Sequence, residues 1–360
     1  MKRSQLCKFM IGTALMVIMG CQHIGPRTIV DDRIPYNEAI STSWKQQTLL
    51  NIVRLRYMDV PEFVDVPSIV NGYEHSRTLS GGLGADVFPR NSLLNVLGAN
   101  LNGSGGMVDR PTISYSPQTG SEFTRNLTNP LPPVSILNLI ESGYPADVVM
   151  DLAVESINGV RNRSFTGSMQ PGDPEFPRVL ELMKIAQASG TVSLRLTKAE
   201  GPDGSDVVMT IRDREIPADL TQDLTELREI LRLDRDQESF KVVFGMLPAA
   251  KDELAIRTRS ILRILTFLAL NVQVPESHLA DGRVPDLGDT SSAVQPQMTV
   301  LSGCEMPSDA YVAVRYQGHY FWIDQRDLPS KRSLNYLKLL LALADTERKE
   351  SAPALTIRAN

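Results

Sequence analysis

The sequence predicts an α+β fold with an N-terminal helix and β-hairpin region, central helices, and C-terminal repeated ββα units. Three observations favour this class. Apolar residues recur at helical spacing over 37–58, apolar and small residues alternate with period two over 79–101, and strand-strand-helix patterns follow one another from residue 191. Helices and strands in such separate runs are typical of α+β proteins.

The first residues predict a lipoprotein signal peptide over 1–20. Basic residues open it, and Phe9–Gly20 is an uncharged, largely apolar run that is too short to span a bilayer. The run ends in Ile18-Met19-Gly20-Cys21, which resembles the lipobox of lipoprotein precursors, with a small residue directly before the cysteine. We therefore expect cleavage before Cys21 and anchoring through acyl chains, such as palmitate, on Cys21. The alternative is an ordinary signal peptide followed by a chance cysteine.

The residue after the cysteine bears on location. Gln22 stands where an Asp would favour retention in the inner membrane. The expected location is therefore the outer membrane, with the lipid-anchored protein on its periplasmic face.

The composition of the mature chain excludes some partners. Residues 21–360 carry 34 basic and 42 acidic side chains, a net charge of −8, which argues against nucleic acid. The mature length suits two or three domains. Changes in composition divide it into a tether over 21–35, a helix plus Gly-rich β-hairpin region over 36–132, a helical region over 133–190, and an α+β domain of repeated ββα units over 191–360.

The first predicted helix runs from Asn37, a plausible N-cap, to about Met58. Asp59-Val60-Pro61 ends it, because proline disfavours the helical conformation of the residue before it. Polar residues over 45–47 lie mostly opposite the apolar face. That face is expected to contain Ile40, Trp44, Leu49, Ile52, Val53 and Tyr57.

Two alternating runs then predict a β-hairpin. They cover 79–87 and 93–101, and the segment 88–92 between them contains Pro and Asn. A further strand is expected over Thr112–Tyr115.

Helices are predicted next. Pro132-Pro133 opens one helix, which Gly143 ends, and Pro145 opens a second that reaches about Val160. A third helix is expected over 175–188.

The last part of the chain predicts three ββα units in succession. Their helices cover 217–233, 259–270 and 332–343, each after two strands, and a loop rich in Pro, Gly, Ser and Asp covers 281–309. The second and third helices align as RSILRILTFLAL and RSLNYLKLLLAL. This similarity predicts a duplicated α+β layer.

Two segments of this chain resemble a family of uncharacterised Gram-negative lipoproteins. The segments are NIVRLRYMDVPEFVDVPSIV (Asn51–Val70) and PTISYSPQTGSEFTRNL (Pro111–Leu127). The resemblance implies a location in the cell envelope and identifies no functional residue.

The sequence contains no recognisable catalytic, cofactor or metal-binding motif. The histidines have no HExxH or Cys/His metal spacing, and no G-x-S-x-G elbow or phosphate-binding loop occurs. We expect no enzyme, no cofactor and no metal. Cys7 falls in the signal and Cys21 is expected to be lipidated, so Cys304 is expected to be a lone, inert thiol.

An aromatic hairpin over 316–322 is one candidate binding surface. Tyr316, His319, Tyr320 and Trp322 can stack on sugar rings, and peptidoglycan is the nearest glycan. The alternative is structural: Tyr320 and Trp322 form one half-buried strand face, and Phe321 lies on the other.

An arginine set at a strand-to-helix junction is the second candidate. Arg257, Arg259 and Arg263 can attract an anion at a helix N-terminus. The alternatives are a solvated face or ion pairs with Asp252 and Glu253.

The sequence thus predicts a non-enzymatic scaffold or interaction protein, anchored by lipid to the outer membrane, with envelope proteins or peptidoglycan as partners. The first alternative is a subunit of an oligomeric outer-membrane pore, to which the chain contributes the 79–101 hairpin. Each strand of this hairpin has about nine residues, which is enough to cross a membrane. Asn95 counts against it, because it interrupts the apolar stripe. The second alternative is an envelope glycan-binding protein.

Overall fold

The computed structural model confirms the α+β class. It describes residues 25–70, 73–84, 98–109, 111–165, 169–198, 205–211, 218–287 and 297–344. The chain divides into two compact units. One is Glu62–Gln118, and the other, the body, combines the residues up to Pro61 with those from Thr119 onward.

The smaller unit contains two antiparallel strand pairs. Strand β1 (Phe63–Val70) pairs with β4 (Thr112–Gln118), which confirms the strand predicted over Thr112–Tyr115. Strand β2 (Tyr73–Gly84) pairs with β3 (Gly98–Asp109) without a break in register. We call the β2–β3 pair the ribbon.

The ribbon confirms a hairpin in this region but shifts its strands. The predicted strands covered 79–87 and 93–101, whereas the paired strands lie farther from the turn. The predicted turn, together with Asn95, falls within 85–97, outside the described residues.

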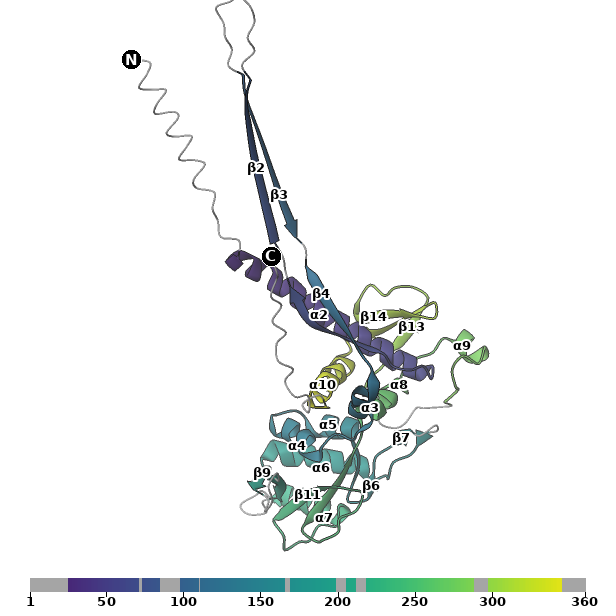
Figure 1. The fold of residues 1–360 in the computed structure, drawn as a ribbon. Helices are drawn as coiled ribbons and strands as arrows, with labels where there is room; N and C mark the ends of the chain where they lie inside the picture. The colour runs from purple at the N-terminus through teal and green to yellow at the C-terminus, as the bar shows by residue number, and fades with distance from the viewer. Residues whose placement is uncertain are drawn as a thin grey trace, which may run out of the picture. The chain divides into compact units, whose positions relative to one another are not determined.

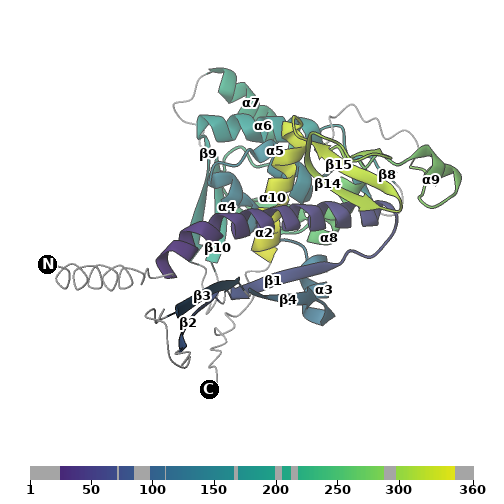
Figure 2. The ribbon, with the colours of Figure 1, turned by 90° about the horizontal axis from the view of Figure 1, so that it is seen from above.

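The body begins with the long helix α2 (Gly25–Arg56), which lies against strand β14 (Ala310–Tyr316) and helix α8 (Ile261–Ala269) (Figure 2). Over 25–35, which the sequence assigned to the tether, the chain is already helical, and the helix includes Pro35. The first half of α2 is largely exposed, so no apolar periodicity revealed it.

The second half of α2 confirms most of the predicted buried face. Leu49, Ile52, Val53 and Tyr57 are buried, whereas Trp44 is half-buried and Ile40 is exposed.

The helical layer was largely predicted. It consists of α4 (Pro133–Glu141), α5 (Ala146–Ala153) and α6 (Phe176–Ser189). Helix α3 (Gly120–Thr128), which was not predicted, lies against α8. Prolines open α4 and α5 as expected, and Gly143 follows α4 with a φ of 97°.

Helix α5 is shorter than predicted. It ends at Ala153, and the chain continues as strands β5 (Val154–Ile157) and β6 (Val160–Arg161). The turn between them is Asn158-Gly159, whose φ angles of 45° and 88° are the left-handed pair that a two-residue hairpin turn requires. This local signal outweighs the helical pattern over 154–160.

The main sheet contains six strands in the order β6-β5-β12-β11-β10-β9. The remaining four are β9 (Val192–Lys198), β10 (Ser205–Ile211), β11 (Ser239–Phe244) and β12 (Glu253–Thr258). Helices α4, α5 and α6 lie beside this sheet (Figure 1). Helix α7 (Ala218–Ile230) follows β10, and α8 follows β12.

The last part of the chain forms a separate three-stranded sheet with the order β13-β15-β14. Strand β13 is Leu301–Gly303 and β15 is His319–Asp324. Helix α9 (Glu276–Ala280) precedes this sheet in the chain, and helix α10 (Leu328–Ala344) follows it. Elsewhere in the body, the short strands β7 (Ser164–Phe165) and β8 (Met169–Gln170) pair with each other.

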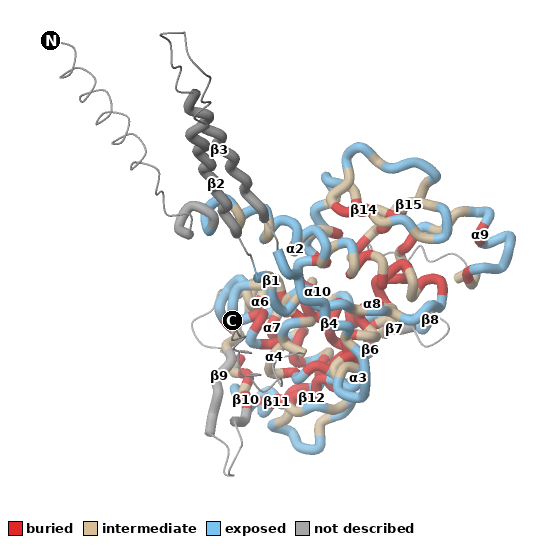
Figure 3. The backbone as a smooth tube through the Cα atoms, turned by 45° about the horizontal axis from the view of Figure 1, so that its top comes forward, coloured by how far each residue is buried: buried red, intermediate tan, exposed pale blue. Residues whose placement is uncertain are grey.

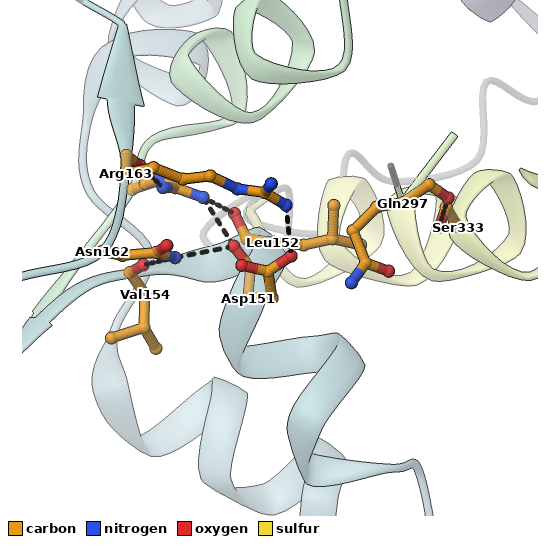
Figure 4. A network of polar contacts seen from close by, with 8 residues as sticks. Asp151, Leu152, Val154, Asn162, Arg163, Gln297 and Ser333 are labelled. Carbon is orange, nitrogen blue, oxygen red and sulfur yellow. Dashed lines mark hydrogen bonds and ion pairs between the residues drawn. The ribbon is translucent and has the colours of Figure 1, made fainter. Parts of the chain in front are cut away.

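The predicted succession of three ββα units is confirmed in chain order, as β9-β10-α7, β11-β12-α8 and β14-β15-α10. The predicted duplication is wrong, because the three units differ in topology. Strands β9 and β10 are antiparallel, β11 and β12 are parallel, and β14 and β15 belong to another sheet. The aligned serines also differ: the hydroxyl of Ser260 caps α8 by accepting from the Arg263 amide, whereas Ser333 lies inside α10 and donates to the Gln297 carbonyl (Figure 4). The helices share an apolar pattern because both pack against the core.

Helix α8 forms part of the core of the body, whose buried segments come from many elements (Figure 3). Most residues of this helix are buried: Ile261, Ile264, Leu265, Phe267, Leu268 and Ala269. The predicted loop over 281–309 contributes too, because Met298 and Val300 are fully buried and β13 begins at Leu301. That part of the loop prediction is wrong.

Asn158 ties the β5–β6 turn to two neighbours. Its side-chain amide donates to the Leu231 carbonyl (2.9 Å), and its oxygen accepts from the Ala255 amide (2.8 Å), both in buried positions. Gln317 has nearly the same φ, 44°, before Gly318 but is exposed. The two turns therefore share a backbone conformation and differ in buried hydrogen bonds.

We expect Asn158→Ala to lower the free energy of unfolding by about 3 kcal/mol, because it leaves two buried backbone groups unpaired in addition to the backbone strain. Gln317→Ala, the matched control, should change the free energy of unfolding by less than about 0.5 kcal/mol, because glutamine and alanine both carry a Cβ in the same left-handed conformation. Urea unfolding measures both. Equal losses in the two variants would contradict the role of the buried hydrogen bonds.

Candidate functional site

The aromatic hairpin does not bring its four predicted residues together. Strands β14 and β15 pair antiparallel, with Tyr316 opposite His319. Because side chains alternate along a strand, Tyr320 and Trp322 lie on the opposite face from His319. Phe321 is fully buried, whereas Tyr320 and Trp322 are half-buried. The arrangement is the structural alternative that the sequence also allowed.

The face that carries Tyr320 borders a surface pocket of about 460 Å³ between the hairpin and α2. The Arg315 guanidinium lies 5.9 Å from the centre of the Tyr320 ring. The backbone of Gly303 approaches Trp322 so closely that a Cβ there would lie 3.3 Å from the indole. β13 therefore covers part of Trp322, which reduces the aromatic surface open to a sugar.

The other face carries Tyr316 and His319 into a tyrosine–histidine cluster, which comprises Tyr57, His278, Tyr316, His319 and Phe321. Its centre is a hydrogen bond of 2.7 Å between the Tyr57 hydroxyl and the His278 Nδ1. The His278 and His319 rings meet edge to face with centres 4.6 Å apart, and Tyr316 meets Tyr57 at 5.2 Å.

Burial controls the electrostatics of this cluster. It raises the pKa of Tyr57 to about 12. It also lowers the pKa of His278, and the charges of His319 and Arg283 lower it further. Both partners are therefore neutral at neutral pH, so the Tyr57 hydroxyl can donate to an unprotonated Nδ1. The cluster joins the end of α2 to α9 and to the β14–β15 hairpin.

The three arginines of the predicted set lie at two different sites. Arg259 is buried in the body, with 3% of its surface exposed. Arg257 and Arg263 instead meet at one carboxylate: the Glu155 Oε2 lies 3.4 Å from the Arg257 Nε and 2.5 Å from an Arg263 Nη.

The acidic partners expected for this set are wrong. Glu253 accepts hydrogen bonds from the backbone amides of Ala249 and Ala250. The ion pairs of Arg257 and Arg263 are formed with Glu155 instead.

Glu155 reaches the arginines because of a β-bulge. Register along the β5–β12 pair shifts so that Ser156 lies opposite Arg257 and Val154 lies opposite Thr258. Glu155 is the extra residue in the pairing with β12, and its carbonyl accepts from the Asn162 amide (2.8 Å), which continues the pairing of β5 with β6. Such bulges redirect a side chain.

A pocket of about 460 Å³ opens beside this pair of ion pairs. Its walls include Glu155, Phe244, Met246, Arg257 and Arg263. We call it the arginine pocket. It lies at the carboxyl ends of the parallel strands β11 and β12, a common position for ligands in sheets with parallel strands.

Sequence reasoning missed Glu155, Tyr57 and His278 as site residues. The Asn158-Gly159 dipeptide was a usable signal for β5 and so for Glu155. Nothing in the sequence links Tyr57 to His278, because 221 positions separate them.

The remaining predicted residues are placed as follows. Cys304 is a free, exposed thiol, and Cys21 lies outside the described residues. Within the described ranges, no group of three or more His, Cys, Asp or Glu side chains is arranged to hold a metal ion. None of the helices in that part of the chain combines the length and apolar character that crossing a bilayer requires.

Comparisons of the chain with protein families, with curated proteins and with solved structures find no match.

We expect the free energy of unfolding to fall as the pH drops below about 6.5, because the unfolded chain then binds a proton at His278 that the folded chain resists. His278→Gln keeps an acceptor for Tyr57 and should remove this part of the pH dependence. Urea unfolding at about pH 7.5 and about pH 5.5 measures both proteins. The same pH dependence in the variant would contradict the assignment.

Proposed function

We propose that this chain is a non-enzymatic, lipid-anchored scaffold of the outer membrane, facing the periplasm, which assembles with other copies of itself through the ribbon. One observation carries the proposal. β2 and β3 pair over their whole length, and among the described residues neither strand pairs with another.

A two-stranded ribbon of this kind needs a further partner. Strands of this length span about 40 Å at roughly 3.4 Å per residue. An isolated hairpin is at best marginally stable in water, and each outer edge presents a row of unpaired N–H and C=O groups. Addition of a neighbouring strand satisfies both requirements.

Several features that usually protect a strand edge against pairing are absent from the ribbon, although β2 contains the charged residues Glu74 and Arg77. Neither strand contains Pro or Lys, and the register is unbroken by a bulge. The register sets Leu79 opposite Gly103, and Leu83 opposite Ala99. The small residues Gly103 and Ala99 let the backbone of another strand approach closely.

The lipid anchor supports assembly by concentrating the copies. The lipobox-like sequence ending at Cys21 supports attachment of acyl chains, which restrict the protein to one membrane surface. Copies held in a plane meet at a high effective concentration, so weak edge contacts between ribbons are sufficient.

A pore is the second candidate. The observation that favours it is strand length, since the paired strands exceed the roughly 9–11 residues that a membrane-crossing strand needs. In this version, ribbons from several copies cross the outer membrane together.

A shortened ribbon tests the assembly. The register permits Thr78 to be joined to Ser104 through an Asn-Gly turn, which removes the residues between them and keeps the six remaining register pairs. We expect the lipidated wild type to form oligomers in native mass spectrometry from detergent. The shortened protein should be monomeric, with an unchanged unfolding midpoint for the body.

Two further measurements complete the test. Cys21→Ser should lose labelling by a palmitate analogue, and equal labelling would remove the anchor from the proposal. A wild type that is monomeric at every concentration, or a shortened variant that assembles equally well, would contradict the role of the ribbon. Channel conductance that only the full ribbon supports would select the pore over the scaffold.

A further inference from the structure

We propose that the arginine pocket binds a small organic anion in which a carboxylate or phosphate is joined to an apolar group. The inference concerns the body alone and is independent of the ribbon. It rests on the two guanidiniums, the cavity beside them and the apolar wall.

The arginines have more binding capacity than their carboxylate partner uses. Both contact the same oxygen of Glu155, Oε2. A guanidinium presents several N–H donors in a planar fork, so one carboxylate oxygen cannot saturate two of them. The charged groups in the pocket wall are these two cations and this one anion, which leaves a net positive charge.

Exposure shows which groups an incoming ligand meets. The side chains of Arg257 and Arg263 are 46% and 37% exposed, whereas that of Glu155 is 16% exposed. A ligand that enters from solvent therefore reaches the guanidiniums more readily than the carboxylate. An anion fits this arrangement better than a neutral sugar, because bidentate pairing with a carboxylate or phosphate is the strong interaction of arginine.

The neighbouring wall is apolar and accessible. Phe244 is 56% exposed and Met246 is 43% exposed, and both line the pocket. Large apolar side chains that stand exposed next to cations suit a ligand with an anionic head and an apolar body, since binding removes both side chains from water. The volume of about 460 Å³ falls within the range of small-molecule sites.

Simple aromatic probes test the proposal by calorimetric titration of the folded protein. Phenylacetate and phenyl phosphate combine a ring with a carboxylate or a phosphate, whereas inorganic phosphate lacks the ring and benzyl alcohol lacks the charge. We expect saturable binding of at least one of the two ring-bearing anions, and weaker binding of the other two probes. The comparison of phenylacetate with phenyl phosphate identifies the preferred anionic group.

Substitutions in the pocket give opposite expected effects. Arg257→Gln should weaken binding of the ring-bearing anion about tenfold, because it removes a charge-assisted hydrogen bond. Glu155→Gln should strengthen binding several-fold, because it releases both guanidiniums from the protein's own carboxylate. Arg235→Gln is the matched control: it breaks an exposed ion pair with Glu229, outside the pocket, and should leave binding unchanged.

Two results would overturn the proposal. One is the absence of binding of both ring-bearing anions to the wild type at millimolar concentration. The other is unchanged affinity in Arg257→Gln. Thermal melts of each variant show that it is folded, and Arg257→Gln remains informative if Glu155→Gln proves unstable, because Arg257 lies at the surface.

Discussion

The buried guanidinium of Arg259 is the interaction on which the body depends. It donates to the carbonyls of Asp151 and Leu152, at 2.6 and 3.0 Å, and to the carbonyl of Arg163. Burial lowers the pKa of Arg259 to about 10, so the group is still charged at neutral pH. It also lies over the Phe267 ring, 4.4 Å from its centre. A buried cation is tolerated only when its donors are satisfied, and backbone carbonyls satisfy them here.

The backbone of Arg259 extends this connection. Its amide donates to the Ala153 carbonyl (2.7 Å), and its carbonyl accepts from the Leu131 amide (3.1 Å). A second layer of polar contacts surrounds it: Asn162 donates to the Asp151 and Val154 carbonyls, and Arg163 pairs with the Asp151 carboxylate (Figure 4). These hydrogen bonds around Arg259 lie next to the paired strands β5 and β12. They stabilise the bulged register, which places Glu155 at the arginine pocket. The position of the pocket is therefore a consequence of how Arg259 joins α5, β12 and α8.

What the sequence predicted correctly is local. The starts of α4 and α6 and the hairpin of β9 and β10 follow from proline, glycine and period-two signals within short windows. The Glu155–Arg263 contact is not local, because it joins positions 108 apart. The partners in β11 and β12 are close in sequence, but a short connection between strands ordinarily gives an antiparallel pair, so their parallel pairing was not predicted. The arginine set was found as a cluster in sequence, but burial separates Arg259 from its neighbours, and no sequence pattern distinguishes a buried arginine from an exposed one. Nor did any sequence signal show that Tyr316 and His319 would join Tyr57.

Urea unfolding of Arg259→Met and Arg259→Lys tests the central role of this residue most directly. Methionine fills much of the volume but leaves the carbonyls of Asp151, Leu152 and Arg163 unpaired, so we predict a loss of about 3–5 kcal/mol in the free energy of unfolding. Lysine keeps the charge without the planar fork and should give an intermediate loss. Arg235→Met, at an exposed ion pair, should change the value by less than about 0.5 kcal/mol. An Arg259→Met protein as stable as this control would contradict the account.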